Sequence, residues 1–230
     1  MKIEIFADAD TVAKQAAAIL AGEARAAVAR RGRFVFAVSG GHTPWVMLRA
    51  FAEEVVPWDK VHLVQVDERV APSGDPDRNS THLRESLLDH APLPPEQVYV
   101  MPVELTDLEE AARQYAATLA KIAGTPPLLD LIHLGLGPDG HTASLVPGDP
   151  VLQVSDADVA VTGIYQGRRR VTLTYPLINR AQRILWLVSG SEKADMLVRL
   201  RDGDPSIPGG RVNPQRALVL ADHAAAAKIG

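Results

Sequence analysis

Short apolar runs alternate with longer amphipathic segments along the chain, and this alternation limits the fold more than any other feature of the sequence. Four runs are apolar at almost every position, at 34–38, 61–66, 129–134 and 183–188. Strands covered on both faces have this composition, and we expect further strands at 2–6, 98–101, 170–174 and 217–220. The pattern predicts a doubly wound, Rossmann-like α/β fold with a mostly parallel sheet and helices on both faces.

The ends of the helices are marked by capping residues and glycines. Asp107 is placed to cap a helix that ends at Gly124, and Ser191 to cap one that ends at Gly203. Residues 203–214 hold too many Pro and Gly residues for a regular element, so we expect a surface loop there. No internal repeat or low-complexity linker interrupts the 230 residues. The sequence therefore predicts one domain over residues 1–230.

Composition and charge argue against several classes of function. The formal net charge is -4, with acidic and basic residues mixed along the chain, which argues against a nucleic acid or an anionic membrane as partner. The absence of cysteine excludes disulfides, thiolate metal ligands and a cysteine nucleophile. The N-terminus lacks the apolar core of a secretion signal, and no stretch approaches the roughly 20 apolar residues of a membrane span. We expect a cytoplasmic enzyme or sensor.

Ligands of open parallel sheets bind beyond the carboxyl ends of the strands, so the loops at these ends hold the candidate sites. The first loop, at 39–44, reads Ser-Gly-Gly-His-Thr-Pro. Pro44 suits a first helical turn and Thr43 a cap, while Gly40 and Gly41 let backbone N–H groups approach an anion at the helix N-terminus. A Gly-Gly turn is as often a plain connector, and the residues leave both interpretations open.

Three consecutive charged residues, Asp67, Glu68 and Arg69, follow the strand at 61–66. Because unpaired charges are costly to bury, they either form a surface ion-pair cluster or line a polar cleft. In a cleft, Arg69 would bind a phosphate or an oxyanion, and Asp67 would accept hydrogen bonds from sugar hydroxyls. Lys193, near the start of a later helix, is also placed to reach an anion.

The third loop, at 135–142, holds three glycines around Asp139 and His141. The glycines allow a tight backbone that presents both side chains to the same space. An imidazole beside a carboxylate that fixes its tautomer suits a general base. The usual histidine motifs of metal sites are absent, and so is the Gly-x-Ser-x-Gly motif of serine hydrolases. We therefore expect acid–base chemistry without a metal.

Taken together, these loops resemble the 6-phosphogluconolactonases, within the superfamily that also contains the glucosamine-6-phosphate deaminases. The likeness extends from about residue 3 to the last helix. Its most specific segments are those at 39–44, at 66–69 with Asn79 downstream, at 134–148 and at 170–181.

The resemblance implies hydrolysis of 6-phospho-D-glucono-1,5-lactone to 6-phosphogluconate, the second step of the oxidative pentose phosphate pathway, with no metal or organic cofactor. It makes His141 the general base that activates water, with Asp139 beside it. It implies that Asp67 orients the sugar hydroxyls. It also implies that three cations lie near the phosphate or the oxyanion, namely Arg69, Arg170 and Lys193. It also implies that the substrate is held by the loop residues Ser39, Gly40, Gly41 and Thr43.

Two departures from related sequences bear on the activity. The deaminases carry a glutamate five positions after the histidine, where this chain has Val146, and valine cannot transfer protons. Many lactonases have a proline-rich segment just before the strand at 170–174, where this chain reads Gly-Ile-Tyr-Gln-Gly-Arg-Arg-Arg. This second departure leaves open which arginine contacts the substrate, Arg168, Arg169 or Arg170.

Three hypotheses follow from these residues. The favoured one is a monomeric lactonase whose partner is a small phosphosugar lactone. A deaminase or isomerase would lack an acid–base group at Val146. Related folds also serve as sugar-phosphate sensors of transcription regulators, but such sensors are normally attached to a helix-turn-helix, and only one short predicted strand precedes the first helix here.

Overall fold

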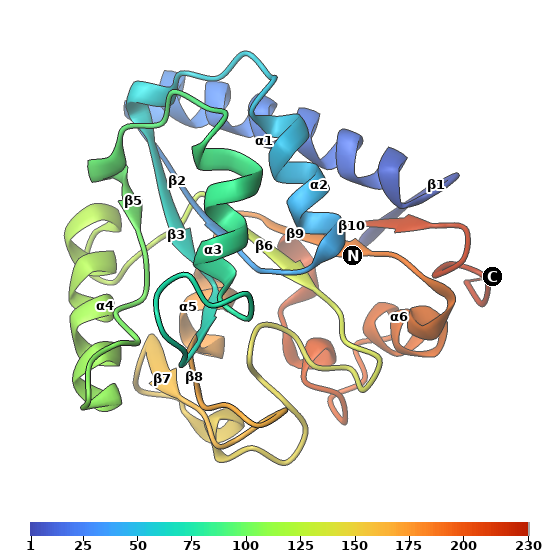
Figure 1. Cartoon of the computed structure of the whole chain (residues 1–230). Coiled ribbons are helices and arrows are strands. Elements are labelled where there is room, and N and C mark those ends of the chain that lie inside the picture. Colours follow the sequence, from blue (N-terminus) through green and yellow to red (C-terminus); the bar gives the residue numbers. More distant parts are fainter. Residues whose placement is uncertain (230) are drawn as a thin grey trace.

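The protein is built on a sheet of seven parallel strands, in the order β1-β10-β9-β6-β2-β3-β5 (Figure 1). The computed structural model describes residues 1–229. The strands of this main sheet are β1 (Lys2–Phe6), β2 (Phe34–Val38), β3 (Val61–Gln65), β5 (Val98–Tyr99), β6 (Leu131–Gly135), β9 (Ile184–Val188) and β10 (Ala217–Asp222). All seven lie within one or two residues of a predicted strand.

Helices cover both faces of the main sheet. One face carries α1 (Ala9–Arg31), α2 (His42–Phe51) and α3 (Asn79–Leu83), and the other carries α4 (Leu108–Ala123), α5 (Tyr175–Arg180) and α6 (Ala194–Arg201). Alternate strand residues enter the two cores: Phe34 and Phe36 share a hydrophobic cluster with α1 and α2, while Val35 and Ala37 share one with α4. The strands β2, β3, β6 and β9 are buried at almost every position, which explains the continuous apolar runs, whereas the edge strands β1 and β5 are partly exposed. The predicted fold class is confirmed.

A second, antiparallel sheet lies below the main one in Figure 1, with the order β4-β8-β7. Its strands are β4 (Asp67–Arg69), β7 (Val159–Val161) and β8 (Arg170–Leu173). The strand predicted at 170–174 is present as β8, where it pairs antiparallel in this second sheet, whereas β4 and β7 were not predicted. The chain leaves the main sheet at Val66, whose carbonyl accepts a hydrogen bond of 2.8 Å from the Leu173 N–H of β8. Val171 and Leu173 share the hydrophobic cluster of α4, so the two sheets have a common core.

Within residues 1–229, seven short helical turns connect these elements. One is a π turn, at Arg84–Leu88. The others are 3₁₀ turns, at Trp58–Lys60, Pro95–Gln97, Pro150–Gln153, Ser191–Lys193, Gly209–Arg211 and Pro214–Arg216.

One predicted helix boundary is confirmed and another is wrong. The Asp107 carboxylate caps α4 by accepting hydrogen bonds from the backbone N–H groups of Glu109 and Glu110, and Gly124 ends the helix. Ser191 does not cap a helix, because it lies in a 3₁₀ turn and α6 begins only at Ala194. The helix also ends at Arg201, two residues before Gly203.

Residues 203–214 were expected to form a surface loop, but part of the segment is buried. Ile207 and Val212 are each 2% exposed, because their apolar side chains enter the interior. The Gly209 N–H donates a hydrogen bond of 2.9 Å to the carbonyl of Gly140. The segment therefore supports the loop that carries Asp139 and His141.

Candidate active site

The predicted loops meet at the point of the main sheet where the strand order reverses. Strands β2 and β6 are neighbours, but the chain continues from β2 to β3 on one side and from β6 to β9 on the other. Connections that diverge in this way leave a crevice beyond the carboxyl ends of the two strands. The loops at 39–44 and 135–142 follow β2 and β6, so both border this crevice.

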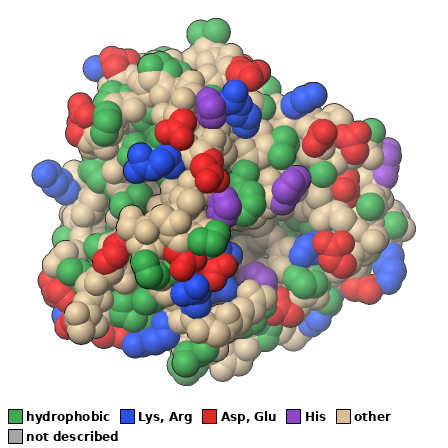
Figure 2. Space-filling model, viewed as in Figure 1, with side chains coloured by type: hydrophobic (Ala, Val, Ile, Leu, Met, Phe, Trp, Pro, Cys, Tyr) green, Lys and Arg blue, Asp and Glu red, His purple; other side chains and the backbone are tan. Residues whose placement is uncertain are grey.

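A cavity of about 350 Å³ occupies the crevice. Nine of the ten predicted site residues line it, namely Ser39, Gly40, Gly41, Thr43, Asp67, Arg69, His141, Arg170 and Lys193. The tenth, Asp139, contacts His141 from behind. Figure 2 shows a hollow on this face, with histidine, acidic and basic side chains around it. The structure therefore brings all ten residues to one place.

His141 and Asp139 form a hydrogen-bonded pair. Asp139 Oδ1 lies 2.5 Å from His141 Nδ1 and accepts a second hydrogen bond from the His141 backbone N–H at 3.1 Å. Partial burial raises the pKa of Asp139, but these hydrogen bonds outweigh the burial and hold the pKa below its usual value. An ionised carboxylate only accepts hydrogen bonds, so the proton lies on Nδ1 and the lone pair on Nε2. The pair can therefore take up a proton at Nε2.

Two glycines make the close approach of His141 possible. A Cβ at Gly137 would lie 2.0 Å from His141 Nδ1. Gly140 has a φ of 81°, and a Cβ there would lie 2.6 Å from the Cβ of Ile207. Side chains at either position would displace the imidazole or its loop.

The loop at 39–44 leads into α2 with backbone N–H groups that no helical carbonyl accepts. The helix begins at His42, so Thr43 lies within the first turn and does not cap it, which corrects the predicted cap. Gly41 is the residue before the helix and has a φ of 125°, a conformation that favours glycine. The loop offers an anion the N-terminus of α2 and the side chains of Thr43 and His42.

Ser39 is tied to His133, a buried residue of β6. The Ser39 N–H donates to His133 Nδ1 at 3.2 Å, and Ser39 Oγ donates to the His133 carbonyl at 3.1 Å. Both donors of Ser39 are thus engaged within the protein, and the loop is anchored on the strand that also carries the Asp139 loop. His133 Nε2 is buried and has no hydrogen-bond partner among residues 1–229.

His133 makes the stability of the protein sensitive to acid. Burial lowers its pKa to about 3, whereas an unfolded chain binds a proton at this histidine below about 6.5. The unfolded state therefore binds more protons between these values, and stability falls as the pH drops from 6.5 towards 3. The wild type should lose about 2 kcal/mol of stability between pH 7 and pH 5 because of His133. We expect His133→Asn, which keeps an acceptor for Ser39, to lose about 2 kcal/mol less than the wild type over this range. Denaturant unfolding at the two pH values measures this, and an unchanged pH dependence would contradict it.

Arg69 and Arg170 lie side by side on neighbouring strands. They are register partners of β4 and β8, and the Nε atoms of both are buried without a hydrogen-bond partner in the described part of the chain. Burial lowers the pKa of Arg170, and the charge of Arg69 contributes to this while Asp67 opposes it. Two adjacent guanidinium groups with spare donors suit an anionic ligand, which would offset their repulsion.

The other two arginines of the 168–170 run lie elsewhere. Arg168 pairs with Asp75 and Asp77 outside the cavity lining, and Arg169 is exposed. Only Arg170 of the three lines the cavity.

Asp67 is held by two residues that were not predicted to form the site. Ser144 Oγ donates to Asp67 Oδ2 at 2.6 Å, and Asn79 Nδ2 donates to the Asp67 carbonyl at 2.9 Å. Asn79 also lines the cavity, where it begins α3. The only signal for Ser144 and Asn79 in the sequence was that they lie in or beside the segments of the family resemblance.

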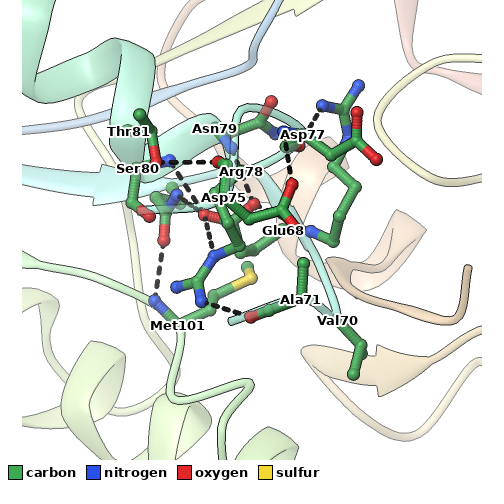
Figure 3. A network of polar contacts seen from close by, with 12 residues as sticks. Glu68, Val70, Ala71, Asp75, Asp77, Arg78, Asn79, Ser80, Thr81 and Met101 are labelled. Atoms are coloured by element: carbon green, nitrogen blue, oxygen red, sulfur yellow. Dashed lines mark hydrogen bonds and ion pairs between the residues drawn. The ribbon is translucent and has the colours of Figure 1, made fainter. Parts of the chain in front are cut away.

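Glu68 points away from the cavity into a buried network (Figure 3). Its carboxylate pairs with Arg78, with 3.2 Å between Glu68 Oε2 and Arg78 Nε. It also accepts hydrogen bonds of 2.8–2.9 Å from one side-chain amide and three backbone N–H groups, those of Gln65, Arg69, Asn79 and Ser80. Because side chains alternate along a strand, Asp67 and Arg69 reach the cavity while Glu68 forms a buried ion pair. Neither predicted alternative for this cluster included such a pair.

Lys193 contributes a third cation to the cavity lining. Its side chain is 18% exposed, and the nearest carboxylate oxygen, of Glu192, is 3.9 Å from Nζ. Burial lowers the pKa of Lys193, while the charges of Glu192 and Asp139 oppose this. Val146 is 5% exposed and does not line the cavity.

Neither a metal cluster nor a membrane span is found in the described residues. Within residues 1–229, no group of three or more His, Asp or Glu side chains is arranged to hold a metal ion. None of the helices described is long and apolar enough to cross a bilayer.

Known proteins show extensive similarity to this chain. The family model of glucosamine-6-phosphate isomerases/6-phosphogluconolactonase matches residues 7–221. A 6-phosphogluconolactonase of Mycobacterium tuberculosis is 40% identical over 241 residues, covering 99% of this chain and 98% of the relative. One of Synechocystis is 40% identical over 200 residues, covering 84% and 83%. The structure of a 6-phosphogluconolactonase from Thermotoga maritima has a TM-score of 0.85 at 26% identity, covering 96% and 98%. The chain therefore belongs to the glucosamine-6-phosphate isomerase/6-phosphogluconolactonase family.

Proposed function

We propose that the protein is a 6-phosphogluconolactonase that hydrolyses 6-phospho-D-glucono-1,5-lactone to 6-phosphogluconate. The observation that carries the proposal is the His141–Asp139 pair at the edge of a cavity that also holds Arg69, Arg170 and Lys193. Relatives with 40% identity that bear this name support it. The protein would act as a cytoplasmic monomer, as one domain and without a cofactor.

The proposed reaction begins at His141. Its Nε2 takes a proton from water, and the hydroxide attacks the lactone carbonyl to give a tetrahedral oxyanion. The bond between the carbonyl carbon and the ring oxygen then breaks, and the imidazolium returns the proton to that oxygen. Asp139 keeps the second imidazole proton on Nδ1 and stabilises the imidazolium. One base and one water complete the hydrolysis.

The phosphate would lie between the N-terminus of α2 and the cations of the cavity. Arg69 and Arg170 have unpaired buried Nε groups, and the first turn of α2 has free N–H groups. The carboxylate of Asp67, oriented by Ser144, would accept hydrogen bonds from the sugar hydroxyls. Either arginine or Lys193 would also stabilise the oxyanion.

The conformation of the 39–44 loop should control substrate affinity through Gly40. A Cβ on Gly40 would lie 2.0 Å from Asn79 Oδ1, and Asn79 supports Asp67. We expect Gly40→Ala to raise KM about tenfold or more, since contacts to a charged ligand contribute about 1.5–3 kcal/mol each. Gly22→Ala is the matched control, because a Cβ there meets no atom within 4 Å. Steady-state kinetics measure the effect, and equal KM values for the two variants would remove the loop from substrate binding.

The test of the proposed function compares two substrates. The protein is given freshly prepared 6-phosphogluconolactone and, in parallel, glucosamine 6-phosphate, both with a chelator present. We expect turnover of the lactone only, because Val146 offers no acid–base group for a deaminase. Turnover of the amino sugar would favour the deaminase, and binding of phosphosugars without turnover of either substrate would indicate a sensor.

A further inference from the structure

Tyr165 contacts the catalytic pair from the second sheet. Its hydroxyl donates a hydrogen bond of 3.1 Å to Asp139 Oδ2. Its ring meets the His141 imidazole edge to face, with 5.6 Å between centroids and 64° between planes. The Arg170 guanidinium carbon lies 5.0 Å from the centroid of the same ring. Tyr165 thus touches three residues of the site, although it does not line the cavity.

A tight turn fixes the position of Tyr165. The Tyr165 N–H donates to the Arg168 carbonyl at 3.0 Å, and the Arg168 N–H donates back at 3.3 Å. The two residues between them, Gln166 and Gly167, have φ values of 51° and 80°. Positive φ at both central residues is typical of the two-residue turns that match the twist of a hairpin. The turn belongs to the hairpin of β7 and β8, so Tyr165 is held by a different sheet from the one that carries Asp139.

The Asp139 carboxylate is consequently held on both sides. One oxygen accepts from His141 and the other from Tyr165. Burial and the charge of Asp139 raise the pKa of Tyr165, so the phenol stays protonated and remains a donor. The Asp139 side chain is 37% exposed, so without this donor water would compete for the carboxylate and the side chain would rotate more freely.

We propose that Tyr165 is a positioning residue, which acts by holding Asp139 in the orientation that directs His141 Nε2 into the cavity. The inference rests on the proposed function, because it assigns Tyr165 to the base of that reaction. Through this residue the hairpin turn of β7 and β8 contributes a hydroxyl to the site.

The test compares Tyr165→Phe with Ile164→Ala. Ile164 is the adjacent hairpin residue, and its apolar side chain is 76% exposed. We expect Tyr165→Phe to lower kcat about 10–100-fold with KM unchanged, as loss of one hydrogen bond to a charged group predicts. Ile164→Ala should leave both constants unchanged. In a His141→Ala background, Tyr165→Phe should cause no further loss, because its effect passes through the imidazole. An unchanged kcat, or an equal loss in both backgrounds, would overturn the proposal.

A second measurement needs no substrate. NMR titration of the Asp139 carboxyl carbon should show a higher pKa in Tyr165→Phe than in the wild type, because one hydrogen bond to the carboxylate is lost. An unchanged Asp139 titration would overturn the positioning role. If the wild type fails to open the lactone but the Asp139 titration moves upward, the proposed function fails while the contact between Tyr165 and Asp139 stands.

Discussion

Replacing His141 with alanine is expected to lower kcat for lactone hydrolysis by about 10²–10⁴-fold, the usual contribution of a general base. His141 lines the cavity, and because Asp139 contacts Nδ1, Nε2 is left to take up a proton; among residues 1–229 no other histidine of the cavity lining pairs with a carboxylate. The affinity for 6-phosphogluconate should change little, because the arginines and the α2 loop remain. Initial rates and isothermal titration of the product measure the two quantities.

His90→Ala is the control for this substitution. His90 is exposed and lies outside the cavity lining, so its removal should leave kcat unchanged. If His141→Ala weakened product binding as much as it lowered kcat, His141 would be a binding residue and the assignment of the base would be wrong.

Replacing Arg170 with methionine is expected to raise KM about 10–100-fold, since a hydrogen bond to a charged group contributes about 1.5–3 kcal/mol. Methionine keeps most of the side-chain length and removes the charge. The protein should remain folded, because Arg170 has no carboxylate partner within ion-pair distance in the described residues and its charge repels that of Arg69. Kinetics and competition by inorganic phosphate measure the loss.

Arg168→Met separates this effect from a general loss of positive charge. Arg168 lies two residues away and pairs with Asp75 and Asp77 outside the cavity. Its replacement should leave KM within about twofold, in line with the small energies of partly exposed ion pairs. If Arg168→Met raised KM as much as Arg170→Met, the substrate would contact the run of arginines differently from the proposal.

The loops of the site could be predicted because each interrupts an apolar run with glycine or charged residues. The sequence placed the Asp139–His141 loop and the 39–44 loop at the ends of strands, and the structure has them there. Their proximity could not be predicted from the local pattern, since it depends on the pairing of β2 with β6, whose strands are separated by almost 100 residues in the chain. Only the family resemblance joined the two loops in advance.

The second sheet was missed because its strands are short and lack the signals of a parallel sheet. β4 has three residues, all charged, and β7 has three. The charged residues of β4 have low strand propensity, and β7 is too short to stand out although two of its three residues are valines. Both become strands by pairing with β8. The contacts of Tyr165 and the buried position of Glu68 both depend on this sheet, and therefore neither could be predicted from the sequence.

The most direct test of the account is the rate at which the wild-type protein opens freshly prepared 6-phosphogluconolactone, corrected for spontaneous opening and measured with a chelator present. The account predicts a rate far above the spontaneous background that the chelator does not change, because His141 and the cations of the cavity suffice for the reaction. A rate equal to the background would contradict the lactonase assignment, and a rate abolished by the chelator would contradict a mechanism that needs no metal ion.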